Sequence, residues 1–289
     1  MNYYSKQTLI NRLCEIRDLG WIETQRKGND GGVGNTLEDL LGIEENNLPL
    51  PNAGEWEVKG QRAESSSLAT LFHMEPSPRA MRFVPQILLP GYGWPHKDAG
   101  IKFPKDELSF RQTLTARERT NRGFTVVVNR EVGRIEISFD PKSVDTHTHS
   151  EWLRSVRDRK GLTELRPQPY WGFEDLFHKA GTKLNKTLYA IAERKREGGS
   201  EYFHYSEFYM LEGFRLERFL DAIEQGDVLV DFDARTGHNH GTKFRLRQNK
   251  YPNLYETVQE VVCDNREDCA SPVGSLVRNR ESTTNYTLF

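Results

Sequence analysis

The chain has 289 residues, of which 36% are hydrophobic and 28% charged, as is ordinary for a soluble globular protein. No run approaches the roughly 18 apolar residues of a membrane span, and the first residues lack the pattern of a signal peptide, so we expect a cytoplasmic protein with no membrane contact. The formal net charge of −2 argues against a protein that simply coats nucleic acid, because phosphate neutralisation favours a basic surface.

Regular apolar spacing in the N-terminal part predicts a helix over residues 5–19. A second helix is expected over residues 36–41, with Thr36 or Asn35 as its N-cap. After a connection that contains proline, residues 55–59 alternate charged and apolar side chains, which predicts a half-buried strand.

The rest of the chain predicts mostly strands and irregular segments. In chain order these are a strand or short helix over 66–72, an irregular stretch over 76–110, a β-hairpin over 123–139, a strand over 184–192, a helix over 208–225, and strands over 228–233 and 242–247. Beyond residue 250 the pattern is weak.

Cysteine and histidine give no clear metal or disulfide signal. The cysteines are three in number and lack CxxC spacing, so they predict neither a disulfide framework nor a zinc knuckle. Asp145, His147 and His149 alternate as zinc ligands on a strand can, but the sequence offers no second cluster, and a polar loop is the favoured interpretation.

Basic residues gather in four segments despite the balanced total charge, although any single segment is more often a solvated face than a binding patch. These segments contain Arg26 and Lys27; Arg111, Arg117, Arg119 and Arg122; Arg154, Arg157, Arg159 and Lys160; and Lys243, Arg245, Arg247 and Lys250.

Side-chain alternation places Glu55, Glu57 and Lys59 on one face of the strand predicted over 55–59. Two carboxylates and an ammonium group are costly to bury together, and a divalent cation would compensate the charge. Mg²⁺ binds through one or two carboxylates and keeps positions for water and a phosphate oxygen, and a lysine can orient the attacking water. On its own the triplet is also common on solvent-facing strands.

A longer pattern surrounds this triplet. The runs GWIETQRKGNDGGVGNTLEDLL and PNAGEWEVKG, followed by YWGFEDLF, GDVLVDF and GHNHGTKFR, resemble the MvaI/BcnI restriction endonucleases over roughly residues 20–247. The resemblance implies an α/β (α+β) fold with a PD-(D/E)xK core of the MutH-like branch, in which helices flank a central mixed sheet. It also implies a clamp-like, two-lobed monomer that cleaves double-stranded DNA with Mg²⁺ at a short CC-x-GG-like site. A DNA methyltransferase acting on the same site is the expected cellular partner.

Residue by residue, the resemblance places the second acid of the motif at Glu57 and the lysine at Lys59. The first acid, an Asp in the family, falls on Asn52, whose neutral amide oxygen is the weaker metal ligand. Glu55 or Glu38 could replace it, the chain could be an inactivated variant, or the motif could be shifted. The resulting expectation is that Asn52, Glu57, Lys59, Glu55 and Glu38 are catalytic, with Asn52, Glu57 and Glu55 as Mg²⁺ ligands.

The segment with His238, His240, Lys243 and Arg245 resembles the DNA-reading part of the family. Arginine suits guanine O6 and N7, and histidine can donate to the same atoms. Alone, the two histidines would favour a turn held by its own hydrogen bonds, but the resemblance of the surrounding GTKFR run reverses this preference.

Asp231 matches an acid that could accept from cytosine N4, whereas Asp233 stands where an enzyme of the family has Arg, which favours a different recognition site. Arg26 and Lys27 are expected to contact phosphate, which positions DNA without reading it.

From these motifs we expect a mainly catalytic lobe over 1–165, a mainly DNA-recognition lobe over 166–250, and a C-terminal extension over 251–289. Two other functions fit the same residues. One is a MutH-like repair endonuclease that nicks one strand. The other is a nuclease-inactive, sequence-specific DNA-binding protein, which Asn52 suggests.

Overall fold

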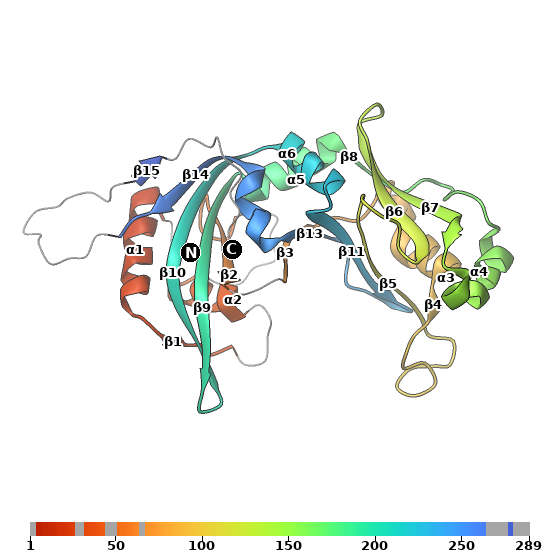
Figure 1. Cartoon of the computed structure of the whole chain (residues 1–289), viewed down its shortest axis with the longest axis horizontal. Helices are drawn as coiled ribbons and strands as arrows, with labels where there is room; N and C mark the ends of the chain where they lie inside the picture. Colours follow the sequence, from red (N-terminus) through yellow and green to blue (C-terminus); the bar gives the residue numbers. More distant parts are fainter. Residues whose placement is uncertain (1–3, 27–31, 44–50, 64–66, 264–276, 280–289) are drawn as a thin grey trace, which may run out of the picture. The chain divides into compact units, whose positions relative to one another are not determined.

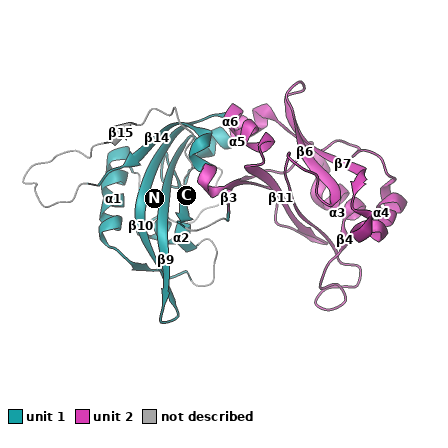
Figure 2. Cartoon of the chain, viewed as in Figure 1, with its two compact units in different colours: residues 1–67, 179–215, 251–289 teal, residues 68–178, 216–250 magenta. Residues whose placement is uncertain are grey.

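A computed structural model describes residues 4–26, 32–43, 51–63, 67–263 and 277–279, and it confirms the expected mixed α+β fold (Figure 1). The chain divides into two compact units (Figure 2). Unit 1 comprises Met1–Ser67, Lys179–Arg215 and Tyr251–Phe289, and unit 2 comprises Leu68–His178 and Leu216–Lys250.

The two units alternate along the chain, which differs from the consecutive lobes expected over 1–165 and 166–250. Only the boundary after residue 250 coincides with a boundary between units. The alternation arises because strands from the first and last parts of the chain join one sheet, and such long-range pairing leaves no local sequence signal.

A mixed sheet forms the centre of unit 1. Its described strands follow the order β15-β14-β10-β9-β2, and β1 pairs with β10. β2 (Glu57–Arg62) runs parallel to β9 (Lys186–Glu197), whereas the other neighbours are antiparallel. The remaining strands are β1 (Ile22–Glu23), β10 (Ser200–Phe214), β14 (Tyr255–Val261) and β15 (Val277–Asn279).

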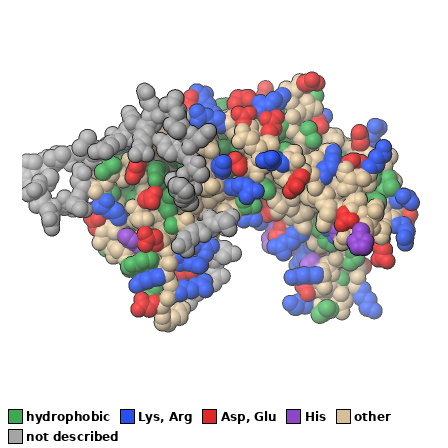
Figure 3. Space-filling view, viewed as in Figure 1, with side chains coloured by type: hydrophobic (Ala, Val, Ile, Leu, Met, Phe, Trp, Pro, Cys, Tyr) green, Lys and Arg blue, Asp and Glu red, His purple; other side chains and the backbone are tan. Residues whose placement is uncertain are grey.

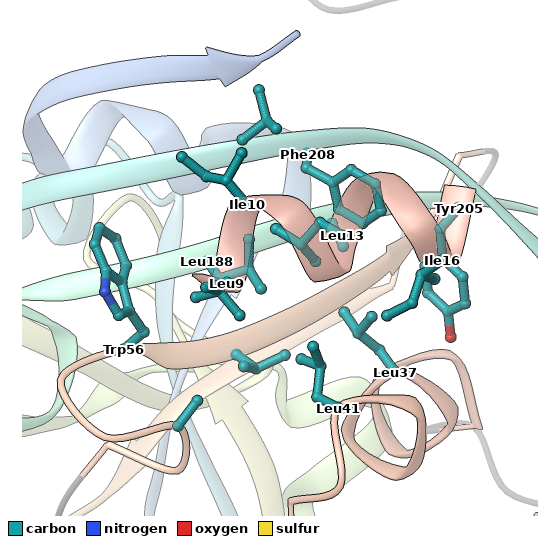
Figure 4. Packing of buried hydrophobic residues seen from close by; sticks show 14 of the residues in the cluster. Leu9, Ile10, Leu13, Ile16, Leu37, Leu41, Trp56, Leu188, Tyr205 and Phe208 are labelled. Carbon is teal, nitrogen blue, oxygen red and sulfur yellow. The ribbon is translucent and has the colours of Figure 1, made fainter. Parts of the chain in front are cut away.

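Two helices, α1 (Lys6–Asp18) and α2 (Gly32–Leu40), pack on one face of this sheet. The apolar side of α1 fits the predicted spacing, and Ser5 caps its first turn by accepting a hydrogen bond from the amide of Thr8. Figure 4 shows the resulting core, in which side chains of both helices meet side chains of β9 and β10. It contains Leu9, Ile10, Leu13 and Ile16 of α1, Leu37 and Leu41, Trp56, Leu188, Tyr205 and Phe208.

Unit 2 contains two sheets within its described residues. The larger follows the order β3-β13-β11-β5-β4, with β12 paired to β11, and the smaller follows β6-β7-β8. Its strands are β3 (Leu68–His73), β4 (Trp94–Pro95), β5 (Leu108–Leu114), β6 (Arg122–Asn129), β7 (Arg134–Val144), β8 (Tyr170–Gly172), β11 (Val228–Arg235), β12 (His238–Asn239) and β13 (Lys243–Arg247).

Helices of unit 2 include α3 (Leu89–Tyr92), α4 (Thr146–Lys160) and α6 (Leu216–Glu224), while α5 (Phe173–Leu184) carries the chain from unit 2 back into unit 1. Shorter helical segments are η1 (Arg79–Met81), η2 (Val84–Leu88) and η3 (Gln248–Leu254). The core is largely aromatic, and the ring of Phe124 contacts those of Phe110, Phe139 and Trp152.

Three local expectations were wrong. The predicted helix over 208–225 is a strand, β10, as far as Phe214, and only α6 is helical, because β9 and β14 pair with the segment on both sides. Thr36 is not an N-cap but lies inside α2, where its buried hydroxyl donates to Thr24 Oγ1. Asp145 to His149 form no loop, since Asp145 caps α4 by accepting from the amide of His147.

The cysteines also differ from expectation, because Cys14 and Cys263 form a disulfide. It joins α1 to the residue range that follows β14, across a sequence separation of 249 residues. No local spacing could reveal a pair so far apart in the sequence.

Candidate active site

The geometry of the candidate site starts with Glu57 and Lys59, which alternate onto the same face of β2. Glu57 is only 1% exposed, and its Oε1 lies 2.6 Å from Lys59 Nζ. Its other oxygen, Oε2, is buried and has no hydrogen-bond partner among the described residues. A buried carboxylate with one unsatisfied oxygen is costly unless a cation or a donor completes it.

A second lysine reaches the same carboxylate. Lys183, in the last turn of α5, has its Nζ 3.5 Å from Glu57 Oε1. The side chains of Lys59 and Lys183 are 22% and 25% exposed, so both are partly buried. Sequence reasoning missed Lys183, because only the pairing of β2 with β9 brings the end of α5 beside Glu57.

Asn52 joins this strand to α2. Its Oδ1 accepts a 2.7 Å hydrogen bond from the amide of Val58, and its Nδ2 donates to Glu38 Oε1 over 2.7 Å. The structure therefore places Asn52 beside the first residues of β2 and in direct contact with Glu38.

Glycine allows α2 to approach the strand closely. A Cβ atom on Gly60 would lie 3.0 Å from both the Cα and the amide nitrogen of Gly34. These neighbours are backbone atoms, so a residue with a Cβ would fit at this crossing only if the helix shifted by a few tenths of an ångström. The contact holds the helix that carries Glu38 against the strand that carries Lys59.

Glu55 lies apart from these groups. The strand begins at Glu57 rather than at residue 55, and Glu55 sits in a turn closed by hydrogen bonds between Ala53 and Trp56. Its side chain is 69% exposed and forms an ion pair with Lys186. The predicted arrangement of Glu55 on one strand face with Glu57 is therefore not seen.

Buried tyrosines form part of the same neighbourhood. Tyr251 stacks on Tyr189, the residue paired with Lys59 across β2 and β9, with ring centroids 5.2 Å apart. Tyr255 stacks on Tyr251 and shares a 2.7 Å hydrogen bond with Thr187. Burial first, and the negative charge of Glu57 in addition, raise the pKa of both Tyr251 and Tyr255, so both rings stay neutral.

This segment carries oxygen donors of the kind that Mg²⁺ prefers. They are the unpaired Glu57 Oε2, the Asn52 amide oxygen, which accepts from the amide of Val58, and the Glu38 carboxylate. Across the described ranges, no group of three or more His, Cys, Asp and Glu side chains is placed to hold a metal. Mg²⁺ needs only one or two carboxylates, because water and phosphate supply the remaining oxygens.

The predicted base-reading residues lie in unit 2, on the solvent side of β11 and β13. Asp231 accepts a 2.9 Å hydrogen bond from Thr113 Oγ1, and its Oδ2 lies 3.3 Å from Arg245 Nη1. Lys243 is the register partner of Asp231. Asp231, Lys243 and Arg245 are thus brought together, and the neighbour Thr113 was not expected from the sequence.

His238 and His240 are exposed next to this face, with their Nε2 atoms 3.1 Å apart. That contact agrees with the plainer interpretation of a turn held by its own hydrogen bonds, and it leaves the ring edges accessible.

Arg26 lies in unit 1, where its guanidinium forms two hydrogen bonds with Asp39. Hydrogen bonding from Arg26 lowers the pKa of the Asp39 carboxyl, so the ion pair persists at neutral pH. Lys27 lies outside the described residues.

Figure 3 shows acidic and basic side chains interspersed over the visible face, in keeping with the net charge of −2.

Comparison with known proteins identifies the family. The sequence pattern of the MvaI/BcnI restriction endonuclease family matches residues 10–255, and the chain belongs to this family. Family membership places it among the sequence-specific DNA endonucleases. None of the curated proteins compared with the chain matches it.

Two solved structures are similar over nearly the whole chain. The first, restriction endonuclease MvaI in complex with its cognate DNA substrate, is 26% identical, with a TM-score of 0.69, 89% of this chain covered and 99% of that chain. The second, MvaI in the absence of DNA, is 25% identical, with a TM-score of 0.53, 91% of this chain covered and 100% of that chain.

Among the described helices, none is both long and apolar enough to cross a membrane.

Proposed function

We propose that the chain is a Mg²⁺-dependent type II restriction endonuclease that cleaves both strands of duplex DNA at a short CC-x-GG-like site. The observation that supports this most directly is the buried Glu57 carboxylate, which faces Lys59 and keeps one oxygen without a partner. Such a carboxylate is expensive as a purely structural feature, but it is useful where a cation and a phosphate bind.

Within this proposal, each residue near Glu57 has a definite role. Glu57 and the Asn52 amide oxygen hold the metal, with Glu38 as the neighbouring charged group, whereas Glu55 is the least suited because it is exposed and paired with Lys186. When bound, Mg²⁺ supplies positive charge to the attacked phosphate and lowers the pKa of a water. Lys59 orients the attacking water and stabilises negative charge on the phosphate.

DNA recognition is assigned to other residues. Asp231, His238, His240, Lys243 and Arg245 contact base edges in the major groove, where carboxylates accept from cytosine and arginines donate to guanine. Arg26 and Lys27 contact phosphate. The similarity to MvaI, which was solved in complex with its cognate DNA substrate, supports DNA binding by this chain.

The cellular side of the proposal follows from the family. A nuclease with a short recognition site would also cut the host chromosome, so a DNA methyltransferase of the same specificity protects it. We further propose that the enzyme acts as a monomer in the cytoplasm.

Digestion of a supercoiled plasmid by the purified chain tests the nuclease function. With Mg²⁺ we expect discrete linear fragments, and with EDTA no cutting. Lys59→Ala is expected to abolish cleavage, because it removes the amine that orients the attacking water and stabilises negative charge on the phosphate. Normal cleavage by a folded Lys59→Ala protein would show that this site does not catalyse the reaction.

The same digest separates two alternatives. Nicked circles instead of fragments would indicate a MutH-like nickase. Retarded bands in a gel shift without any cutting would indicate a DNA-binding protein without nuclease activity. The second alternative is favoured by one observation, namely that Asn52 donates to Glu38 where the family has a charged acid.

A further inference from the structure

A second pair of charged side chains lies beside the proposed base-reading residues. Along β11 the side chains of Asp231 and Asp233 alternate with the buried residues Val230 and Phe232, so both carboxylates project from the solvent face. On β5, the register partner of Asp233 is Arg111. Arg111 Nε lies 3.5 Å from Asp233 Oδ1, with the two side chains 70% and 27% exposed.

This pair repeats the chemistry of Asp231 and Arg245. In both cases the aspartate is on β11 and the arginine is on an adjacent strand, β13 for Arg245 and β5 for Arg111. Each pair therefore presents a guanidinium and a carboxylate side by side on one sheet face.

Stability does not explain the Arg111–Asp233 pair. An ion pair with one partner so exposed contributes little to folding, because water screens the charges and the side chains lose freedom. The strands are held in place by buried neighbours, since Phe110, Phe232 and Ala234 are at most 3% exposed. Arg111 can thus turn toward a ligand without loss of the fold.

We propose that Arg111 and Asp233 form a second base-reading pair that recognises one C·G base pair. This inference rests on the proposed function. In the major groove, a C·G pair offers two acceptors on guanine and an amino donor on cytosine. The guanidinium of Arg111 binds guanine O6 and N7, and the carboxylate of Asp233 accepts from cytosine N4. An A·T pair fits less well, because its single N7 and O4 acceptors are separated by the adenine amino group.

The spacing along β11 assigns the two pairs to different positions of the site. Side chains two residues apart on one strand face are about 7 Å apart, roughly twice the rise of about 3.4 Å per base pair. The Arg111–Asp233 pair therefore reads a base pair other than the one contacted by Asp231 and Arg245.

The test is a selection from a duplex library with randomised positions, read by cleavage in Mg²⁺ and by binding in Ca²⁺. The wild type is compared with Arg111→Ala and Asp233→Asn, and with Arg130→Ala as a control. Arg130 is an arginine of unit 2 that pairs with Glu217, Asp221 and Glu224 of α6. Circular dichroism is used to check that each variant is folded.

We expect Arg111→Ala and Asp233→Asn to lose the preference for C·G at one and the same position, by about 10- to 100-fold. The control and all other positions should keep the wild-type preference. Unchanged base preferences in both variants would overturn the proposal that Arg111 and Asp233 read a base pair. An equal loss of affinity at every position would also overturn it, because such a loss indicates a phosphate contact. If the wild-type protein selects a site by binding but never cuts it, the nuclease proposal fails. The base-reading proposal is then still tested by comparing the binding preferences of the variants with those of the wild type.

Discussion

At the residue scale, the Glu57 carboxylate lies near two ammonium groups, and its second oxygen has no described partner. The two lysines more than balance the charge of Glu57 by itself, and with the carboxylate of Glu38 the four charges cancel. The two ammonium groups can still meet a phosphate group, which carries its own negative charge. The arrangement therefore explains how one buried acid on β2 can serve a metal and a nucleic-acid backbone together.

Asn52→Asp tests the departure from the family motif. A second carboxylate would lie where Asn52 Nδ2 now donates to Glu38 over 2.7 Å, so the two acids repel each other without a cation and bind one more tightly with it. We expect a larger Mg²⁺-dependent rise in melting temperature than in the wild type, together with faster cleavage. An unchanged or lower cleavage rate would argue that Glu38 or Glu55 is the working ligand.

Lys183→Gln tests the second lysine. Removing its charge from the 3.5 Å contact with Glu57 should slow single-turnover cleavage by about 100-fold, as loss of one electrostatic group at a reacting centre does. Lys186→Gln is the matched control, because Lys186 is near in sequence and bonds the exposed Glu55 instead. Equal effects of the two substitutions would contradict a special role for Lys183 and would favour Glu55 as a participant.

At the element scale, the crossing of α2 over β2 determines whether Glu38 and Lys59 meet. Gly60→Ala should lower the free energy of unfolding by about 1–3 kcal/mol, because the added Cβ would lie 3.0 Å from backbone atoms of Gly34. The control is Gly172→Ala in β8, where the nearest atom to a Cβ is 4.0 Å away. Urea unfolding followed by circular dichroism measures both, and an equal midpoint for the two variants would show that the helix can retreat.

Elements with a clear period were predictable. Alternation in β11 and β13, and the hairpin of β6 and β7, agree with the sequence expectation to within a few residues. The segment 208–214 was not, because Phe208, Met210 and Leu211 fit both a helical and an extended pattern. Its neighbours β9 and β14 decided the outcome by pairing with it.

At the scale of the whole molecule, the disulfide between Cys14 and Cys263 links α1 to the residues that follow β14. Cys14→Ser with Cys263→Ser should lower the stability of unit 1 by about 2–4 kcal/mol, because the bond restricts the unfolded chain. Thermal unfolding of the double variant and of the wild type, each with and without reductant, measures the effect. If reductant leaves the melting temperature of the wild type unchanged, the disulfide does not stabilise the fold.

The candidate site also depends on the whole chain. Tyr251 and Tyr255 belong to the C-terminal extension whose role the sequence left open, yet they stack against Tyr189 beside the strand of Lys59. Truncation after residue 250 would remove both rings from their stack on Tyr189.

The amino-acid sequence alone determined the family, the α+β class, and the pairing of Glu57 with Lys59, because these depend on motifs and on alternation within a single strand. Tertiary structure alone decided that Lys183 contacts Glu57, that Glu55 stays apart, that Asn52 bonds Glu38, and that Arg111 lies opposite Asp233. The reason is physical: a side chain's neighbours along the strand follow from the two-residue period, whereas its neighbours across strands and helices follow from pairing and packing between segments up to hundreds of residues apart.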